Sequence, residues 1–123
     1  MDDRAVITAV TLDTTDLERA ERFWSTVLGL EVVQRAHPYV YLSRICPGGP
    51  YLALQQVPEP KTAKNRLHFD VRVPDRAAAA ESIAALGGSV LGEHQEGDFP
   101  TWTVVADPEG NEFCIYEPSA AAA

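Results

Sequence analysis

The sequence predicts an α+β fold built from two tandem βαβββ modules. Each half of the 123-residue chain shows one strand pattern, then a helix pattern, then three further strand patterns. Each helix pattern follows a capping aspartate, Asp16 or Asp75, and ends at a Leu-Gly pair, Leu28-Gly29 or Leu86-Gly87. This self-similarity indicates an internal duplication. Because neither module covers both faces of its own sheet, we expect the two sheets to pair into an open sheet that forms a polar cleft.

The first module is expected over residues 5–57. Residues 6–13 alternate with a period of two and are rich in β-branched side chains, which predicts a strand. The helix follows over residues 17–28, where apolar residues recur every three or four positions. Trp24 lies on this apolar stripe, so we interpret it as core or dimer seam. The other elements are strands at 31–35, 39–45 and 51–57, with a turn at 47–50.

The second module is expected over residues 66–117, after a linker at 58–65 that contains two prolines. Its first strand, 67–73, alternates apolar residues with the ionisable residues His68, Asp70 and Arg72, as a strand lining a polar cavity would. The remaining elements are a helix at 76–86, strands at 89–92, 99–106 and 111–117, and a turn at 107–110. Residues 1–118 would thus form one domain, and 119–123 a disordered tail.

Composition narrows the classes of function. A net charge of −8 argues against nucleic acid and anionic membranes as partners, because both require basic patches. The charge either attracts a cationic ligand or serves solubility alone. No apolar run reaches the length of a membrane span, and the N-terminus lacks the order of a signal peptide, so we expect a cytoplasmic protein. The two cysteines, Cys46 and Cys114, are expected to be free thiols.

Three stretches resemble the vicinal oxygen chelate superfamily, the group of glyoxalase I, bleomycin-resistance proteins, fosfomycin-resistance enzymes and extradiol dioxygenases. They are Phe-Trp-Ser-Thr-Val-Leu-Gly-Leu at 23–30, Leu-His-Phe-Asp at 67–70 and Ala-Asp-Pro-Glu-Gly-Asn-Glu-Phe at 106–113. The resemblance spans nearly the whole chain and is closest to small glyoxalase-like domain proteins. It implies paired chains, so we expect a homodimer.

The resemblance also implies where a metal would bind. Metal-using members carry ligands on the first and last strand of each module, and these positions fall here on Ala9, Ala53, His68 and Cys114. Since alanine has no donor atom, we expect that the family's metal has been lost and that no cofactor is held. The alternative is a divalent metal at a displaced set, Gln55, His68 and Glu112, with Asp70 as a further ligand, because residues two apart on a strand share a face.

The candidate ligand-binding residues face the expected cavity. They are Thr11, Gln55, His68, Asp70, Arg72, Thr103, Cys114 and Tyr116. His68 is either a cavity histidine hydrogen-bonded to Asp70 or a catalytic general base. Cys114 is interpreted as a small buried hydrophobe and not as a nucleophile. A four-residue turn at 107–110 would turn Thr103 toward the cavity and Trp102 toward the core, unless a bulge reversed them.

The leading hypothesis is a protein of the glyoxalase and bleomycin-resistance type, with a degenerate metal site, that binds a small organic molecule, cationic given the protein's charge, in a polar cleft. The acidic stretch at 93–98 is a solvated loop or a lip over the cavity. One rival is an enzyme, a lyase, isomerase or dioxygenase that depends on a metal or on His68. The other rival is an interaction module with a vestigial cavity.

Overall fold

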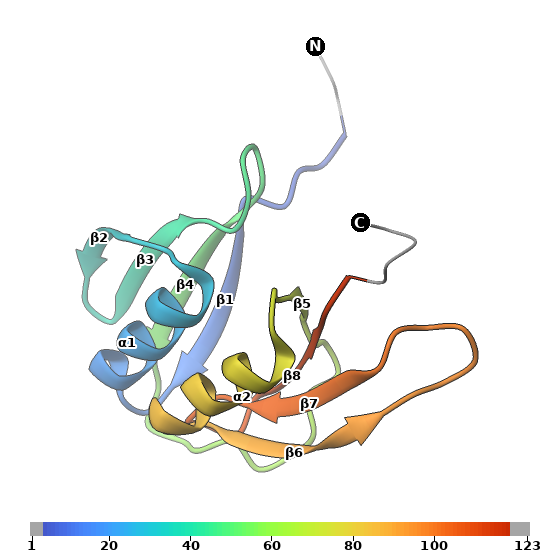
Figure 1. Cartoon of the computed structure of the whole chain (residues 1–123). Helices are drawn as coiled ribbons and strands as arrows, with labels where there is room; N and C mark the ends of the chain where they lie inside the picture. Colours follow the sequence, from blue (N-terminus) through green and yellow to red (C-terminus); the bar gives the residue numbers. More distant parts are fainter. Residues whose placement is uncertain (1–3, 119–123) are drawn as a thin grey trace. The chain divides into compact units, whose positions relative to one another are not determined.

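The computed structural model describes residues 4–118 and divides into two compact units whose boundary lies between Pro60 and Lys61 (Figure 1). Unit 1 contains β1, α1, β2, β3 and β4, and unit 2 contains β5, α2, β6, β7 and β8. Each unit is one βαβββ module, which confirms the predicted fold class. The tail predicted at 119–123 lies outside the described residues. Within residues 4–118, neither helix has the length and apolar character needed to cross a membrane.

Unit 1 is a four-stranded sheet with one helix. Its elements are β1 (Ala9–Thr14), α1 (Leu17–Leu28), β2 (Val32–Ala36), β3 (Tyr39–Arg44) and β4 (Tyr51–Gln56). The strand order is β1-β4-β3-β2; β1 runs parallel to β4, and the other pairs are antiparallel. The helix contacts β3 and β4, and its buried residues are Ala20, Phe23 and Trp24. Trp24 is 1% exposed, so it belongs to the core of unit 1.

Unit 2 repeats this plan. Its elements are β5 (Asp70–Arg72), α2 (Arg76–Ala85), β6 (Ser89–His94), β7 (Trp102–Ala106) and β8 (Glu112–Tyr116). The order is β5-β8-β7-β6, again with a parallel first pair. Helix α2 contacts β6, β7 and β8, and the fully buried Val105, Phe113 and Ile115 alternate along the two central strands. One face of this sheet therefore packs against α2 in the core, and the side chains between these buried residues point to the opposite face.

The helix caps form as predicted. An Oδ1 atom of Asp16 accepts the backbone N–H of Arg19 at 3.1 Å, and Oδ1 of Asp75 accepts that of Ala78 at 3.0 Å. Each bond satisfies a donor that the first helical turn leaves unpaired. Helix α1 ends at Gly29 with a φ of 65°, a left-handed conformation that glycine adopts without steric cost.

The duplication extends to individual hydrogen bonds. In unit 1 the side chain of Gln56, at the end of β4, accepts the N–H of the first helical residue, Leu17, at 3.2 Å. In unit 2 Glu117, just after β8, accepts the N–H of Arg76 at 2.8 Å. Matching the modules by helix start and strand end makes Ala9, Thr11 and Ala53 the counterparts of His68, Asp70 and Cys114. The cross-strand pairs agree, since Thr11 pairs with Ala53 and Asp70 pairs with Cys114.

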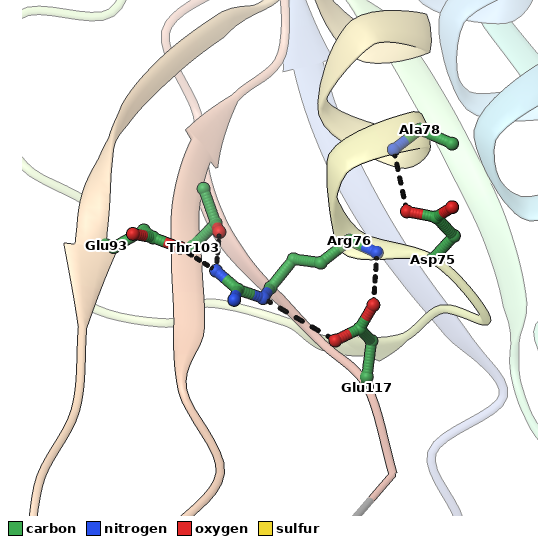
Figure 2. Close-up of polar contacts among 6 residues, drawn as sticks. All are labelled: Asp75, Arg76, Ala78, Glu93, Thr103 and Glu117. Carbon is green, nitrogen blue, oxygen red and sulfur yellow. Dashed lines mark hydrogen bonds and ion pairs between the residues drawn. The ribbon is translucent and has the colours of Figure 1, made fainter.

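Arg76 anchors the start of α2 to the sheet of unit 2 (Figure 2). Its Nη1 donates to the hydroxyl of Thr103 on β7 at 2.9 Å and to the carboxylate of Glu93 on β6. Its Nε lies 4.0 Å from a carboxylate oxygen of Glu117, whose other oxygen accepts the backbone N–H of Arg76. One side chain thus joins the helix to β6, to β7 and to the end of β8.

Several strand ends differ from prediction. The first strand begins at Ala9 and not at residue 6, because its partner β4 begins at Tyr51, which pairs with Ala9. In unit 2, β5 covers only 70–72 of the predicted 67–73, β6 continues to His94, and β7 begins at Trp102 and not at residue 99. Alternating residues beyond the reach of a partner strand stay outside the ladder: Leu67 is 85% exposed and Phe99 is 70% exposed.

Candidate functional site

The pairing of β5 with β8 brings His68, Asp70 and Cys114 together on the face of the unit 2 sheet that α2 does not cover. Asp70 and Cys114 are paired residues of the parallel strands β5 and β8. The hydrogen bond from the Cys114 N–H to the carbonyl of Phe69, at 2.9 Å, holds this register. His68 precedes Asp70 by two positions, so its side chain emerges on the same face. Residues 46 positions apart in the sequence are thereby placed side by side.

The three side chains form a cluster of different donor atoms. One nitrogen of His68, one carboxylate oxygen of Asp70 and the sulfur of Cys114 all lie within 4.8 Å of one another. His68 Nε2 is 3.4 Å from Asp70 Oδ1, and the two side chains are 57% and 68% exposed. In the part of the chain that the structure describes, this is the group of histidine, cysteine and acidic side chains suited to hold a metal ion. The predicted pairing of His68 with Asp70 is present as this close contact.

A cavity of about 550 Å³ lies beside the cluster. Its volume is within the usual range for sites that bind small organic molecules. Its wall combines the clustered polar side chains with aromatic rings and a second carboxylate; the lining residues are His68, Asp70, Cys114, Glu96, Phe99, Pro100, Trp102 and Tyr116. Glu96 belongs to the acidic stretch 93–98, just after the end of β6 at His94, so that stretch contributes to the rim of the cavity, as one of its two interpretations proposed.

Trp102, and not Thr103, faces this cavity, so the predicted register of β7 is wrong. Trp102 pairs with Tyr116 and Val104 with Cys114, whereas Thr103 pairs with Ile115 in the core. Thr103 is 4% exposed and accepts the hydrogen bond from Arg76 on the helix side. The cause is the loop between β7 and β8, which contains five residues and not four. One extra residue in the loop shifts the register of β7 by one position, so every side chain of β7 points to the face opposite to the predicted one.

Asp107 explains the longer loop. Its carboxylate accepts the backbone N–H groups of Glu109 and Asn111, at 3.0 and 2.8 Å, and the side-chain amide of Asn111 at 2.9 Å. The backbone N–H of Asp107 donates in turn to the carbonyl of Asn111 at 2.9 Å. These bonds hold Asn111 in the loop, so β8 begins at Glu112. An aspartate followed four residues later by asparagine was the available sequence signal for this closure.

The surroundings of Cys114 favour its neutral thiol and so disfavour nucleophilic attack. Burial, and after it the negative charges of Asp70 and Glu112, raises the pKa of its thiol. A raised pKa leaves less of the reactive thiolate at neutral pH. The ring of His94 stacks on the indole of Trp102, with 5.8 Å between the two ring centroids. Trp102, which was predicted to face the core, thus lies between this stacking partner and the cavity.

The other predicted residues belong to unit 1 or, within unit 2, do not line this cavity. Thr11, Ala53 and Gln55 share one face of the sheet in unit 1, where Thr11 pairs with Ala53 and Gln55 pairs with Asp13. In unit 2, Arg72 pairs with Tyr116 and is exposed without lining the cavity. Glu112 lines a neighbouring hollow that also involves Lys64 and His94, and it is not one of the three clustered donors. The displaced metal set of Gln55, His68 and Glu112 stays a prediction.

Comparison with known proteins identifies the family of this chain. Residues 9–116 match the family model of the glyoxalase-like domain. A glyoxalase/bleomycin resistance protein/dioxygenase family enzyme from Burkholderia phytofirmans PsJN has a similar structure, with a TM-score of 0.75 and 17% identity, over 92% of this chain and 98% of that chain. A glyoxalase-related enzyme from Fulvimarina pelagi gives a TM-score of 0.73 and 20% identity, over 95% of this chain and 94% of the other.

A third similar structure carries ligands. It is a mutant of the fosfomycin resistance protein FosX from Listeria monocytogenes, complexed with Mn(II) and 1S,2S-dihydroxypropylphosphonic acid, with a TM-score of 0.75 and 15% identity over 94% of this chain and 90% of that one. Among curated proteins, none matches the sequence significantly. At these identities the structural likeness establishes the fold alone, and the family model establishes membership. The chain therefore belongs to the glyoxalase-like domain family, within the vicinal oxygen chelate superfamily.

Proposed function

We propose that this protein binds a small organic cation in the cavity of unit 2. The observation that carries the proposal is the composition of the cavity wall. Three aromatic rings, those of Phe99, Trp102 and Tyr116, line it together with the carboxylates of Asp70 and Glu96. Neither lysine nor arginine is among these lining residues, all of which belong to the described chain. Aromatic faces and carboxylates both attract a positive charge, and rings also bind apolar surface.

The proposal does not depend on the metal site of the superfamily. Two of the four family positions, Ala9 and Ala53, carry no donor atom, so the four-ligand arrangement is degenerate. The charge of the whole protein also supports a cationic ligand. The whole protein carries a net charge of −8, which raises the local concentration of cations.

Binding is tested with three matched probes: phenethylammonium, 2-phenylethanol and 3-phenylpropionate. We expect affinity to fall in that order, by about fivefold per step, as for about 1 kcal/mol of attraction between partly exposed charges. Calorimetry on chelator-treated protein gives the affinities. Quenching of Trp102 fluorescence reports the location, since Trp24, the other tryptophan, is buried in unit 1. The Trp102→Phe variant should keep binding and lose the quenching.

Charge variants separate the cavity from the net charge. Asp70→Asn and Glu96→Gln should each reduce the preference for phenethylammonium over 2-phenylethanol. Glu59→Gln removes the same charge from the exposed linker and should leave the preference unchanged. An equal loss in all three variants, or equal affinity for the three probes, would show that the cavity does not select a cation.

A proton-transfer enzyme is the second candidate, favoured by the contact of His68 with Asp70 at the cavity wall. A carboxylate beside an imidazole can orient the ring toward a substrate, as a general base requires. The test is exchange of the α-protons of phenylacetone in D₂O, followed by NMR. Catalysed exchange that His68→Ala abolishes would support this function; a wild-type rate equal to that of buffer would exclude it for such ketones.

A further inference from the structure

Unit 1 contains a cavity of its own, of about 450 Å³, between the start of α1, the β2–β3 hairpin and the end of β4. It shares no lining residue with the cavity of unit 2. We propose that this second cavity binds the guanidinium group of a ligand, carried on an aliphatic stem. The proposal rests on the internal duplication, because unit 2 shows what fills the equivalent space there.

In unit 2 that space is filled by the chain's own arginine. Arg76 is the first residue of α2, and its side chain lies against the sheet (Figure 2). Its guanidinium contacts Glu93 on β6, Thr103 on β7 and Glu117 after β8. The start of the helix and the neighbouring strand ends of a module can therefore enclose one guanidinium group.

The same four positions surround the cavity of unit 1. Across β2 and β3, Arg35 pairs with Val40. Glu93 pairs with Thr103 in the same way across β6 and β7. Together with the matched helix starts and strand ends, this pairing makes the counterparts of Arg76, Glu93, Thr103 and Glu117, in that order, Leu17, Arg35, Val40 and Gln56, and all four line the cavity. Leucine ends at the δ carbons, where arginine continues into its guanidinium, so the helix of unit 1 supplies no such group.

The wall of the cavity carries an excess of negative charge. Glu18 and Glu21 lie three residues apart on α1, and therefore on one face of the helix. Glu18 also interacts favourably with the helix dipole in the first turn, whereas Glu21 lies beyond that turn. The counterparts of these two residues on α2 are Ala77 and Ala80. The module itself therefore does not require carboxylates at these positions.

Glu21 already receives a guanidinium, but a weakly held one. Nη2 of Arg35 lies 2.7 Å from Oε2 of Glu21, and the Arg35 side chain is 64% exposed. Because exposed ion pairs contribute little, a ligand can replace Arg35 at this carboxylate. A carboxylate binds guanidinium through two parallel hydrogen bonds, which favours this group over ammonium. Leu17 and Val40 offer apolar contact to a stem, and the ring of Tyr39 attracts a cation.

The proposal is tested on the full chain with butylguanidinium, its neutral isostere butylurea, and butylammonium. We expect one equivalent of butylguanidinium to bind at least about fivefold more tightly than butylurea, with butylammonium between them. Amide chemical shifts in NMR titrations locate the probe, and the changes should centre on residues 16–21 and 35–40. Equal affinity for butylguanidinium and butylurea, or shift changes confined to the cavity of unit 2, would overturn the proposal.

Variants then separate the cavity from the net charge. Leu17→Arg brings into unit 1 the side chain that unit 2 has at this position, so it should abolish saturable binding. Glu21→Gln should weaken the binding of butylguanidinium, whereas Glu81→Gln, on an exposed position of α2, is the matched control and should not. Arg35→Gln removes the competing group and should raise the affinity by up to about fivefold.

The Arg35→Gln result gives the sharpest test, because a residue that merely holds the hairpin in place would lower the affinity when replaced. A loss of affinity in Arg35→Gln, equal losses in Glu21→Gln and Glu81→Gln, or unchanged binding in folded Leu17→Arg would each refute the site. A capped arginine tripeptide, compared with its citrulline analogue, distinguishes a peptide side chain from a free guanidine as the source of the group. Since the two cavities share no residue, this proposal and the one for unit 2 can fail independently.

Discussion

Arg76→Met tests how unit 2 is held together. Methionine keeps most of the apolar stem but removes the guanidinium that joins α2 to the sheet. A hydrogen bond from a charged donor contributes about 1.5–3 kcal/mol, and that to the buried hydroxyl of Thr103 is 2.9 Å long. The pair with Glu93 contributes about 0.2–1 kcal/mol, because the Glu93 side chain is 66% exposed. We therefore expect Arg76→Met to lower the free energy of unfolding by about 2–3 kcal/mol, and Glu93→Gln by about 0.5 kcal/mol.

Urea unfolding followed by circular dichroism measures both changes, provided that the dependence of the unfolding free energy on urea concentration is the same in wild type and variants. Thr103→Val added to Arg76→Met should recover about 1 kcal/mol, because it removes the buried hydroxyl that the first change leaves without its donor. If Glu93→Gln cost as much as Arg76→Met, the exposed ion pair would carry the stabilisation and the reasoning from burial would be wrong. The same conclusion would follow if the double variant recovered nothing.

Three further predictions concern single features. Gly88→Ala should destabilise the protein by about 1–3 kcal/mol in urea unfolding, because a Cβ there would lie 2.5 Å from the carbonyl oxygen of Ala106; a neutral result would mean that the backbone yields. In chelator-treated Cys46→Ser protein, Cys114 should alkylate more slowly when folded than when unfolded in urea. The raised pKa of its thiol reduces the fraction of thiolate in the folded protein, and equal alkylation rates would contradict this explanation. For the same reason, the free energy of unfolding should fall as the pH rises above the ordinary thiol pKa of about 8.5. We also propose a homodimer, because the edge strand β6 exposes Val90 and Leu91 at 49% and 53%. Sedimentation should give twice the chain mass for wild type and a monomer for Leu91→Lys, whereas a monomeric wild type would refute pairing.

Local pattern was sufficient to predict most elements of the fold. Helix α1 begins and ends where the capping aspartate and Gly29 indicate, because caps act within a few residues of the helix end. The duplication was visible for the same reason. His68 and Asp70 were predicted on one face, since a period of two is a property of the strand alone. The residues of the candidate cluster were thus identified individually.

Tertiary structure decided which of these residues meet and which side chains face the cavity. The pairing of Asp70 with Cys114 arises from two strands far apart in the sequence, so no local pattern could reveal the three-donor cluster. Trp102 replaced Thr103 at the cavity because Asp107 closes a five-residue loop, and one residue inverts a strand's faces. Strand ends followed the length of the partner strand, as the start of β1 at Ala9 shows. Alternation along a strand is a local property, whereas its parity relative to a neighbouring strand depends on how the connecting loop closes.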